Sequence, residues 1–414
     1  MSNRKALLLL GVIFPLGCAL IGISTSFAAD LEFKPSIAIS EEFNDNIYET
    51  RVNRRNEFIT RLRPGATLRY KAPRWNWDVD YYFDYRNYAR NSRGDEYNHD
   101  AGLKGNISLI DNFFYLDLSD TYHRVSLDIT RDVTQESPFL NQTDQNIATL
   151  SPYLLWRLGE KTTLKTGYLY IDTRYWGSGI GKRKHGAFAD LTREITSRFT
   201  VSADYTFGKT RTNTTNFDRH DLSGGFRYEY ADRSFLSGQV GNSWQSFSSG
   251  RNANYLFWNV GLTHDLGIAV ATLETKVQFS EDPSTNSTKE TIYSGKLDKE
   301  LNRGAIGFSS SYSEYVNTET GANNRRKLSI AANGRYEILP SLTASLSGTI
   351  ERFSKITEAD YPYRFIVIGG LGYALKNNLT LGLTYTHVNY LNGLDTTIGA
   401  KEINRAVVEV KKGF

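Results

Sequence analysis

The sequence contains little cysteine, methionine or proline, and it has only one long apolar run. Of the 414 residues, one is Cys, one is Met and nine are Pro. Cys18 lies inside the apolar run near the N-terminus, so the rest of the chain has no thiol for disulfides or metal binding. After Ala29 no run of about 18 apolar residues follows, which excludes a later transmembrane helix. The net charge of +4 is too small for this length to indicate a nucleic-acid partner.

The N-terminal run has the pattern of an export signal. Arg4 and Lys5 precede the apolar stretch, and small residues end it at Ala28. We therefore predict a cleaved signal peptide, residues 1–28, for the general secretory pathway, and a single domain, residues 29–414. The alternatives are an uncleaved anchor and a lipoprotein modified at Cys18, although apolar residues continue past that cysteine. An exported protein of this kind is periplasmic, secreted or embedded in the outer membrane.

Aromatic residues and glycine are abundant, and apolar and polar residues alternate along much of the chain. The sequence holds 26 Tyr, 22 Phe and 34 Gly, a composition that favours β-strands and tight turns. In the segment FTVSADYTF, which starts at Phe199, aromatic and aliphatic residues alternate with Thr, Ser and Asp. A period of two over eight or more residues is typical of a strand whose two faces meet different environments.

Turn signals divide the alternating segments at regular intervals. Short turns near residues 72, 111, 160, 197, 232, 267, 303, 340 and 377 alternate with more polar connections near 91–96, 129–142, 210–216, 248–252, 281–287, 317–324 and 392–400. This pattern gives roughly 20 strands, between about 18 and 22, of about 12–16 residues each. Propellers and solenoids also repeat at this spacing, but a propeller blade needs four short strands. We predict an all-β transmembrane antiparallel up-and-down β-barrel from a Gram-negative outer membrane.

A closed barrel in lipid places apolar residues outside and polar residues in the lumen. The six Trp and many Tyr are expected in belts at the two membrane interfaces; the alternative is the core of a soluble β-sandwich. Charges of both signs fall on the polar face, which predicts a hydrated wall with paired charges; these are either ordinary wall salt bridges or part of a substrate site. The predicted lumen-lining residues are Asp78, Asp80, Asp84, Arg86, Arg227, Glu229, Glu351 and Arg405.

No pattern for catalysis or cofactor binding stands out. The six His are scattered without metal-ligand spacing, and no nucleophile or phosphate-binding motif is present. We therefore expect no enzyme activity, no cofactor and no metal. The basic run Lys182, Arg183 and Lys184 lies at the external end of a strand, where it is either a contact for lipopolysaccharide phosphates or another polyanion, or a solvated strand end.

The opening segment PSIAISEEFNDNIY, which starts at Pro35, resembles the first strand of a family of outer-membrane β-barrel porins from Gram-negative bacteria. Some members of that family are associated with exopolysaccharide and exosortase-type loci. The resemblance implies a barrel that passes a polymer or small polar solutes across the outer membrane, with exopolysaccharide as a candidate partner. Outer-membrane lipid and lipopolysaccharide are the partners expected of the barrel itself. It supplies no catalytic residues.

The chain ends on a strand pattern, VVEVKKGF. Val408, Val410 and Phe414 are expected on the lipid face, and a terminal Phe resembles the signal that the outer-membrane assembly machinery recognises. Lys412 occupies an outward position where an apolar residue is usual, and its ammonium can reach the headgroups.

Two functions follow from this interpretation. About 20 strands enclose a water-filled lumen, which predicts a porin-like passage for polar solutes or an exported polysaccharide. The first strand starts close to Ala29, so no plug domain is expected, and loop 129–142 is the candidate constriction. The alternative is a non-conducting structural or surface-adhesion barrel.

Overall fold

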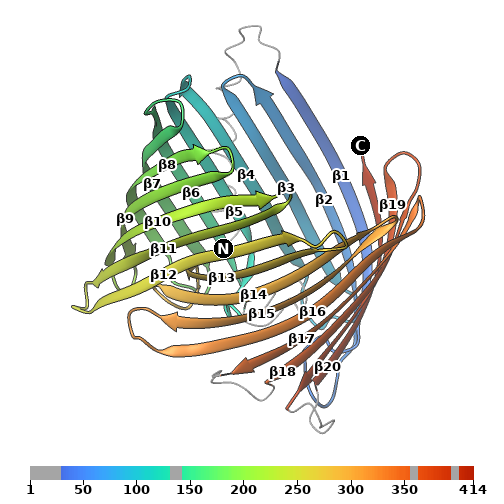
Figure 1. The fold of residues 1–414 in the computed structure, drawn as a ribbon. Helices are drawn as coiled ribbons and strands as arrows, with labels where there is room; N and C mark the ends of the chain where they lie inside the picture. Colours follow the sequence, from blue (N-terminus) through green and yellow to red (C-terminus); the bar gives the residue numbers. More distant parts are fainter. Residues whose placement is uncertain (1–28, 131–141, 355–361, 393–400) are drawn as a thin grey trace.

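The computed structural model describes residues 29–130, 142–354, 362–392 and 401–414. The predicted signal peptide and most of loop 129–142 lie outside the described residues. Those that are described form twenty strands in one antiparallel sheet that closes into a barrel (Figure 1). No helix among them is long and apolar enough to span a membrane. In chain order the strands are β1 (Asp30–Asn44), β2 (Glu57–Ala72), β3 (Trp75–Tyr88), β4 (Glu96–Ile110), β5 (Phe114–Ser126), β6 (Gln142–Arg157), β7 (Thr162–Trp176), β8 (Lys182–Thr196), β9 (Phe199–Thr212), β10 (Phe217–Ala231), β11 (Ser234–Phe247), β12 (Asn252–Asp265), β13 (Val270–Ser280), β14 (Thr288–Leu301), β15 (Gly304–Asn317), β16 (Asn323–Leu339), β17 (Leu342–Ser354), β18 (Tyr363–Ala374), β19 (Leu379–Leu391) and β20 (Lys401–Gly413).

Each strand pairs with its neighbours in sequence, so the topology is up-and-down, as predicted. Tight turns lie at one end of the barrel, here called the turn end, where β1 begins and β20 stops. Between β18 and β19, Asn377 and Asn378 have φ values of 61° and 57°, a left-handed conformation that Asn tolerates better than most residues. The longer connections lie at the opposite end, the loop end.

The barrel closes because β20 pairs with β1. The register runs from Ser36↔Gly413 to Asn44↔Arg405, and the Phe414 amide donates to the Pro35 carbonyl over 3.0 Å. In hydrocarbon an open sheet edge would leave N–H and C=O groups without partners, at a cost of several kcal/mol for each. Figure 1 shows β20, in red, beside β1, in blue. The predicted closed barrel is confirmed.

Alternation along each strand places apolar side chains on the outside. Leu346, Val240 and Val408 are 62%, 56% and 56% exposed on the outer face. So much exposed apolar surface is unfavourable in water, and on a closed barrel it is the band that contacts lipid.

Aromatic residues lie on the outer face toward both ends of the barrel. Trp75, Trp77 and Trp156 are near the turn end, whereas Trp176 and Trp244 are in the loop-end half. Four histidines hydrogen-bond to tyrosine hydroxyls through Nδ1 on this face: Tyr81 with His99 at 2.8 Å, Tyr168 with His185 at 2.6 Å, Tyr205 with His220 at 2.8 Å and Tyr230 with His264 at 2.9 Å. Each pair satisfies polar atoms that are next to lipid.

The inside of the barrel is packed at the loop end. Ile366, Val388 and Ile403, which face inward in register, are each 1% exposed and pack with Tyr390. Ile59 on the inner face packs with Ile47 from the β1–β2 connection, which is fully buried. In a wide water-filled bore these side chains would be exposed, so the loop end is narrowed by packed protein.

Candidate functional site: the loop-end mouth of the barrel

Charged residues on the inner face are exposed to water near the turn end. Arg69 lies 3.5 Å from Asp78, and the two side chains are 63% and 65% exposed. On β14, Lys296 and Asp298 form a 2.8 Å pair, also largely exposed. Pairs this exposed contribute at most about 1 kcal/mol to stability. The turn-end half of the lumen is therefore a hydrated wall with charges of both signs.

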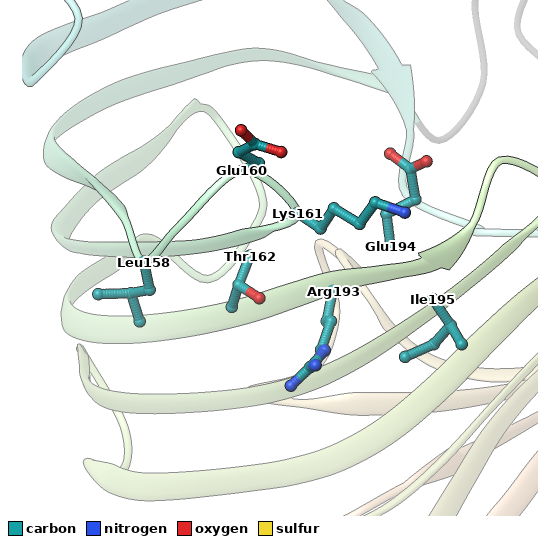
Figure 2. Close-up of a pocket in the computed structure, with 7 residues that line it drawn as sticks. All are labelled: Leu158, Glu160, Lys161, Thr162, Arg193, Glu194 and Ile195. Atoms are coloured by element: carbon teal, nitrogen blue, oxygen red, sulfur yellow. The ribbon is translucent and has the colours of Figure 1, made fainter.

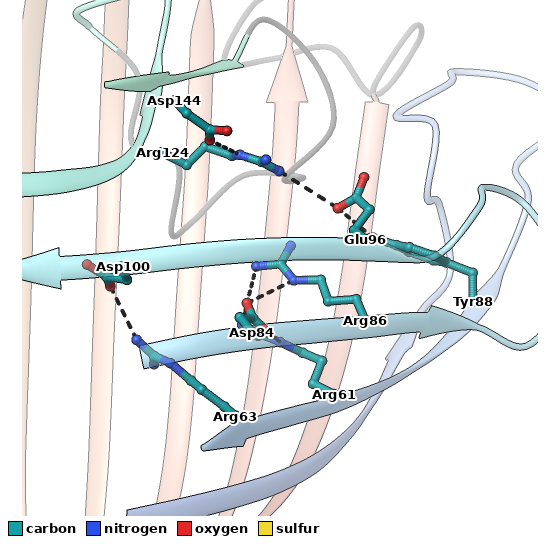
Figure 3. A network of polar contacts seen from close by, with 9 residues as sticks. All are labelled: Arg61, Arg63, Asp84, Arg86, Tyr88, Glu96, Asp100, Arg124 and Asp144. Carbon is teal, nitrogen blue, oxygen red and sulfur yellow. Dashed lines mark hydrogen bonds and ion pairs between the residues drawn. The ribbon is translucent and has the colours of Figure 1, made fainter. Parts of the chain in front are cut away.

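Toward the loop end the same wall becomes buried. Asp84 accepts hydrogen bonds of 2.7 Å from both Arg61 and Arg86, and the Asp84 and Arg86 side chains are 10% and 15% exposed. Arg63 lies 3.3 Å from Asp100 on the turn-end side of this cluster. Nearer the rim, Figure 3 shows a separate group in which Glu96 contacts Tyr88 and Arg124, and Arg124 contacts Asp144.

A second buried cluster lies on β16 to β18, on the other side of the β1–β20 closure from the first cluster. Glu351 on β17 pairs with Arg364 and with Lys327, whose Nζ is 2.7 Å away. Lys327 also donates to the carbonyl of Thr130 over 3.1 Å, and Arg325 lies 3.3 Å from Asp128. Because β5 and β16 are nearly opposite in a ring of twenty strands, the segment 127–130 reaches across the mouth of the lumen. This is the described start of the loop that was predicted as a constriction.

The β13–β14 hairpin also takes part in this closure. Its tip, residues 281–287, extends to β7 and β8, about six strands away. Lys182 Nζ lies 2.6 Å from Glu281 and donates to the Asp282 carbonyl over 3.1 Å. Tyr175 donates to the Glu281 carboxylate over 2.9 Å. We call this group, Tyr175, Lys182, Glu281 and Asp282, the latch.

Further hydrogen bonds hold the tip along the mouth. The amide of Ile180 donates to the Pro283 carbonyl over 2.8 Å. Asn286 accepts from Thr214 over 2.7 Å and donates to Glu319, in the β15–β16 connection, over 2.7 Å. All of these bonds are polar, so water can replace each of them if the tip moves away.

The sequence-predicted lumen residues are distributed along the whole bore. Asp80 lies on the inner wall beside Gly102, Arg227 stacks on Phe235 at 3.7 Å, and Glu229 is exposed near the turn end. Arg405 faces the lumen opposite Asn44. Asp78, Asp84, Arg86 and Glu351 are described above. Only Asp84, Arg86 and Glu351 belong to the buried mouth.

The basic run of β8 divides between two faces. Lys182 points inward and belongs to the latch, where it is 8% exposed. Lys184 shares this inner face. Arg183 points outward, 3.8 Å from Asp172. The three cations therefore do not form one surface, and only Arg183 is placed to meet a headgroup phosphate outside the barrel.

The closing strand places Val408, Val410 and Phe414 on the outer face, and these side chains are 56%, 42% and 67% exposed. Lys412 donates to the Asn377 carbonyl at the turn end. Sequence reasoning missed Tyr175, Glu281 and Asp282 as functional residues. The one signal was an acidic loop tip and a basic strand end of opposite charge, about 100 residues apart.

Two other features carry no assigned chemistry. Within the described ranges, no group of three or more His, Cys, Asp and Glu residues could hold a metal ion. A recess of about 370 Å³ lies at the turn end between the β6–β7 turn and the end of β8 (Figure 2). Its charged residues, Glu160, Lys161, Arg193 and Glu194, are of both signs, and it is distant from the latch.

Comparison with solved structures gives the fold class. The apoprotein form of the FrpB iron transporter from Neisseria meningitidis matches with a TM-score of 0.55 at 10% identity, over 92% of this chain and 81% of that one. The siderophore receptor PirA from Pseudomonas aeruginosa matches with 0.52 at 10% identity, over 92% and 80%. OccK11 (OpdR) from Pseudomonas aeruginosa matches with 0.42 at 12% identity, over 92% and 96%. No protein-family model and no curated protein matches the sequence. The chain has the fold of an outer-membrane β-barrel.

Proposed function

We propose that this protein lies in the outer membrane and forms a water-filled, porin-like passage for polar solutes. In this proposal the latched β13–β14 hairpin closes the passage at its loop end. The change in burial along the bore carries the proposal. Arg69 and Asp78 are more than 60% exposed near the turn end, whereas Lys182 is 8% exposed at the mouth. A hydrated bore that ends in a polar, hydrogen-bonded closure is what a gated passage requires.

The chemistry of the wall supports a polar and uncharged solute, and an exported polysaccharide is one such solute. Positively charged donors and negatively charged acceptors are paired along the wall, as Arg69 and Asp78 are. Such a lining offers hydrogen bonds to hydroxyl groups without selecting one charge. The proposal assigns no chemical step to the chain.

The proposed partners follow from the outer surface. Outer-membrane lipid covers the apolar band, and Arg183 is the candidate contact for lipopolysaccharide phosphates. Phe414 is the candidate contact for the assembly machinery, and nucleic acid is not a proposed partner.

The alternative is a non-conducting structural or surface-adhesion barrel. The observation that favours it is the apolar packing inside the loop end, where Ile366, Val388 and Ile403 are each 1% exposed. A permanent plug of this kind would leave no path for solutes.

Planar-bilayer conductance separates the two functions. Ser280 pairs with Thr288, so residues 281–287 can be replaced by an Asn-Gly turn that joins these two residues directly. We expect larger and longer conductance steps from this variant than from the unmodified barrel. The control shortens the β11–β12 connection, residues 248–251, in the same way. If neither folded barrel conducts, the non-conducting function is correct.

A further inference from the structure

The pairing between β12 and β13 stops halfway along the strands. The register runs from Asn259↔Lys276 to Asp265↔Val270, which is seven pairs, whereas every other neighbouring pair among the described strands has at least nine. Residues 252–258 of β12 pair only with β11, and residues 277–280 of β13 pair only with β14. We call this interruption, formed by residues 252–258 and 277–280, the seam.

At the seam the sheet overlaps itself. Leu273 is 58% exposed on the outer face of β13, and Val277, which shares that face by alternation, is only 5% exposed. Phe279, also on that face, lies 4.4 Å from the guanidinium of Arg219, which belongs to the inner face of β10. The loop-end part of β13, residues 277–280, therefore passes inside the barrel. Its outer face packs against the inner faces of β10 and β12.

The same arrangement holds for the second strand of the hairpin. Lys289 on β14 lies 4.7 Å from the ring of Tyr255, which is on the inner face of β12. Tyr255 also donates to the carbonyl of Thr318. The Lys289–Tyr255 contact, together with the Phe279–Arg219 contact, thus places the hairpin inside the wall formed by β10 and β12.

A cavity of about 240 Å³ lies where β12 and β13 separate. One part of its wall is apolar, formed by Phe257, Trp258, Val277 and Phe279. The other part is polar, formed by Asp221, Gln239, Asn259, Lys276 and Gln278. Asp221 and Gln239 belong to the lumen wall, whereas Trp258 is on the outer face, where it donates to Thr275 over 3.0 Å. The cavity is therefore lined by residues from both faces of the wall.

We propose that the seam is a lateral binding site for an uncharged amphiphile with a hydroxyl-rich headgroup. The headgroup lies among Asn259, Gln278 and the other polar residues, and the tail leaves past Trp258 into the membrane. The volume holds one end of such a molecule, since pockets for whole drug-sized ligands are about 300–1,000 Å³.

We infer that the headgroup of the ligand is uncharged, because the charged residues that line the cavity already form ion pairs. Lys276 lies 3.3 Å from Glu274, and Asp221 lies 2.9 Å from Arg219. Each charge in the cavity wall thus already has a counter-charge. The site can donate and accept hydrogen bonds. A charged headgroup, however, would lose its water on binding and gain no counter-charge, because the charges of the lining are already paired. This inference does not depend on whether the barrel conducts.

Hydrogen exchange on the unmodified protein in phospholipid nanodiscs tests the site, with dodecyl maltoside as the probe. Residues 252–258 pair on one edge only, so they should exchange faster than residues 234–240 of β11, which pair on both edges. We expect the probe to slow exchange at 252–258 and to leave 234–240 unchanged. Equal exchange at 252–258 with and without the probe would overturn the proposal.

Photocrosslinking gives a second readout. A benzophenone amino acid at position 277 should crosslink to dodecyl maltoside with saturation at low probe content, whereas at position 240, on the open lipid face, the yield should rise linearly. Asn259→Ala should raise the half-saturating content about fivefold, because one hydrogen bond is lost. The control Asn333→Ala, on the inner face of β16, should leave it unchanged. Linear yields at both positions, or equal effects of the two substitutions, would refute the site.

Discussion

Replacing Lys182 by Met tests whether the latch holds the mouth closed. Lys182→Met keeps most of the length and apolar stem of the side chain but removes the ammonium that contacts Glu281 and the Asp282 carbonyl. The barrel wall should remain intact, because the backbone of β8 still pairs with β7 and β9 on both edges. The expected result is a barrel that opens more often.

The magnitude follows from the burial of the pair. Lys182 is 8% exposed and Glu281 is 34% exposed. Fully exposed pairs contribute at most about 1 kcal/mol, and removing one partner of a fully buried pair costs about 3–5 kcal/mol. For this half-buried pair we take about 2 kcal/mol. This shifts the ratio of closed to open barrels by about 30-fold.

Single-channel recording in a planar bilayer measures this ratio. Arg183→Met is the matched control, because Arg183 is the next residue on β8 but points outward toward Asp172. The charge exchange Lys182→Glu with Glu281→Lys should restore closure in part, since it rebuilds the pair in the opposite sense. The reasoning is refuted if Lys182→Met, with normal heat-modifiable mobility, has the same open probability as the unmodified barrel.

Three further predictions concern the wall and the closing strand. Glu351→Gln should destabilise the barrel by about 3 kcal/mol, seen as a lower temperature for loss of the folded gel band, because Arg364 and Lys327 would then contact a neutral amide in a buried position. Asp78→Asn should change stability by less than about 1 kcal/mol in the same assay, because it and Arg69 are mostly exposed; a larger loss would show that the turn-end wall is not hydrated. Deleting Phe414 should lower the amount of barrel assembled in cells while purified chains still refold in detergent, and unchanged assembly would argue against the terminal signal.

The sequence by itself determined the strands and their faces, and it placed the number of strands between about 18 and 22. The alternation of apolar and polar residues from Phe199 to Phe207 shows which side chains face lipid. This pattern is local, so it can be recognised without knowing any contact with distant residues. The turn at Asn377 and Asn378 is equally local, since left-handed backbone favours Asn. Each strand has one apolar and one polar face, and the chain is predicted to be exported. Because an open sheet edge in lipid would leave backbone groups without partners, these features together predict a closed barrel.

Only the tertiary structure decided how the mouth closes. Lys182 and Glu281 are 99 residues apart, and nothing in either segment specifies the other. The inward course of β13 is likewise invisible in its alternation: Val277 has an outward position in the pattern, yet it is 5% exposed. Period-two patterning reports which face of a strand a residue occupies, but not whether that strand lies in the wall or inside it. That depends on contacts such as the one between Phe279 and Arg219, which exist only after the barrel has formed.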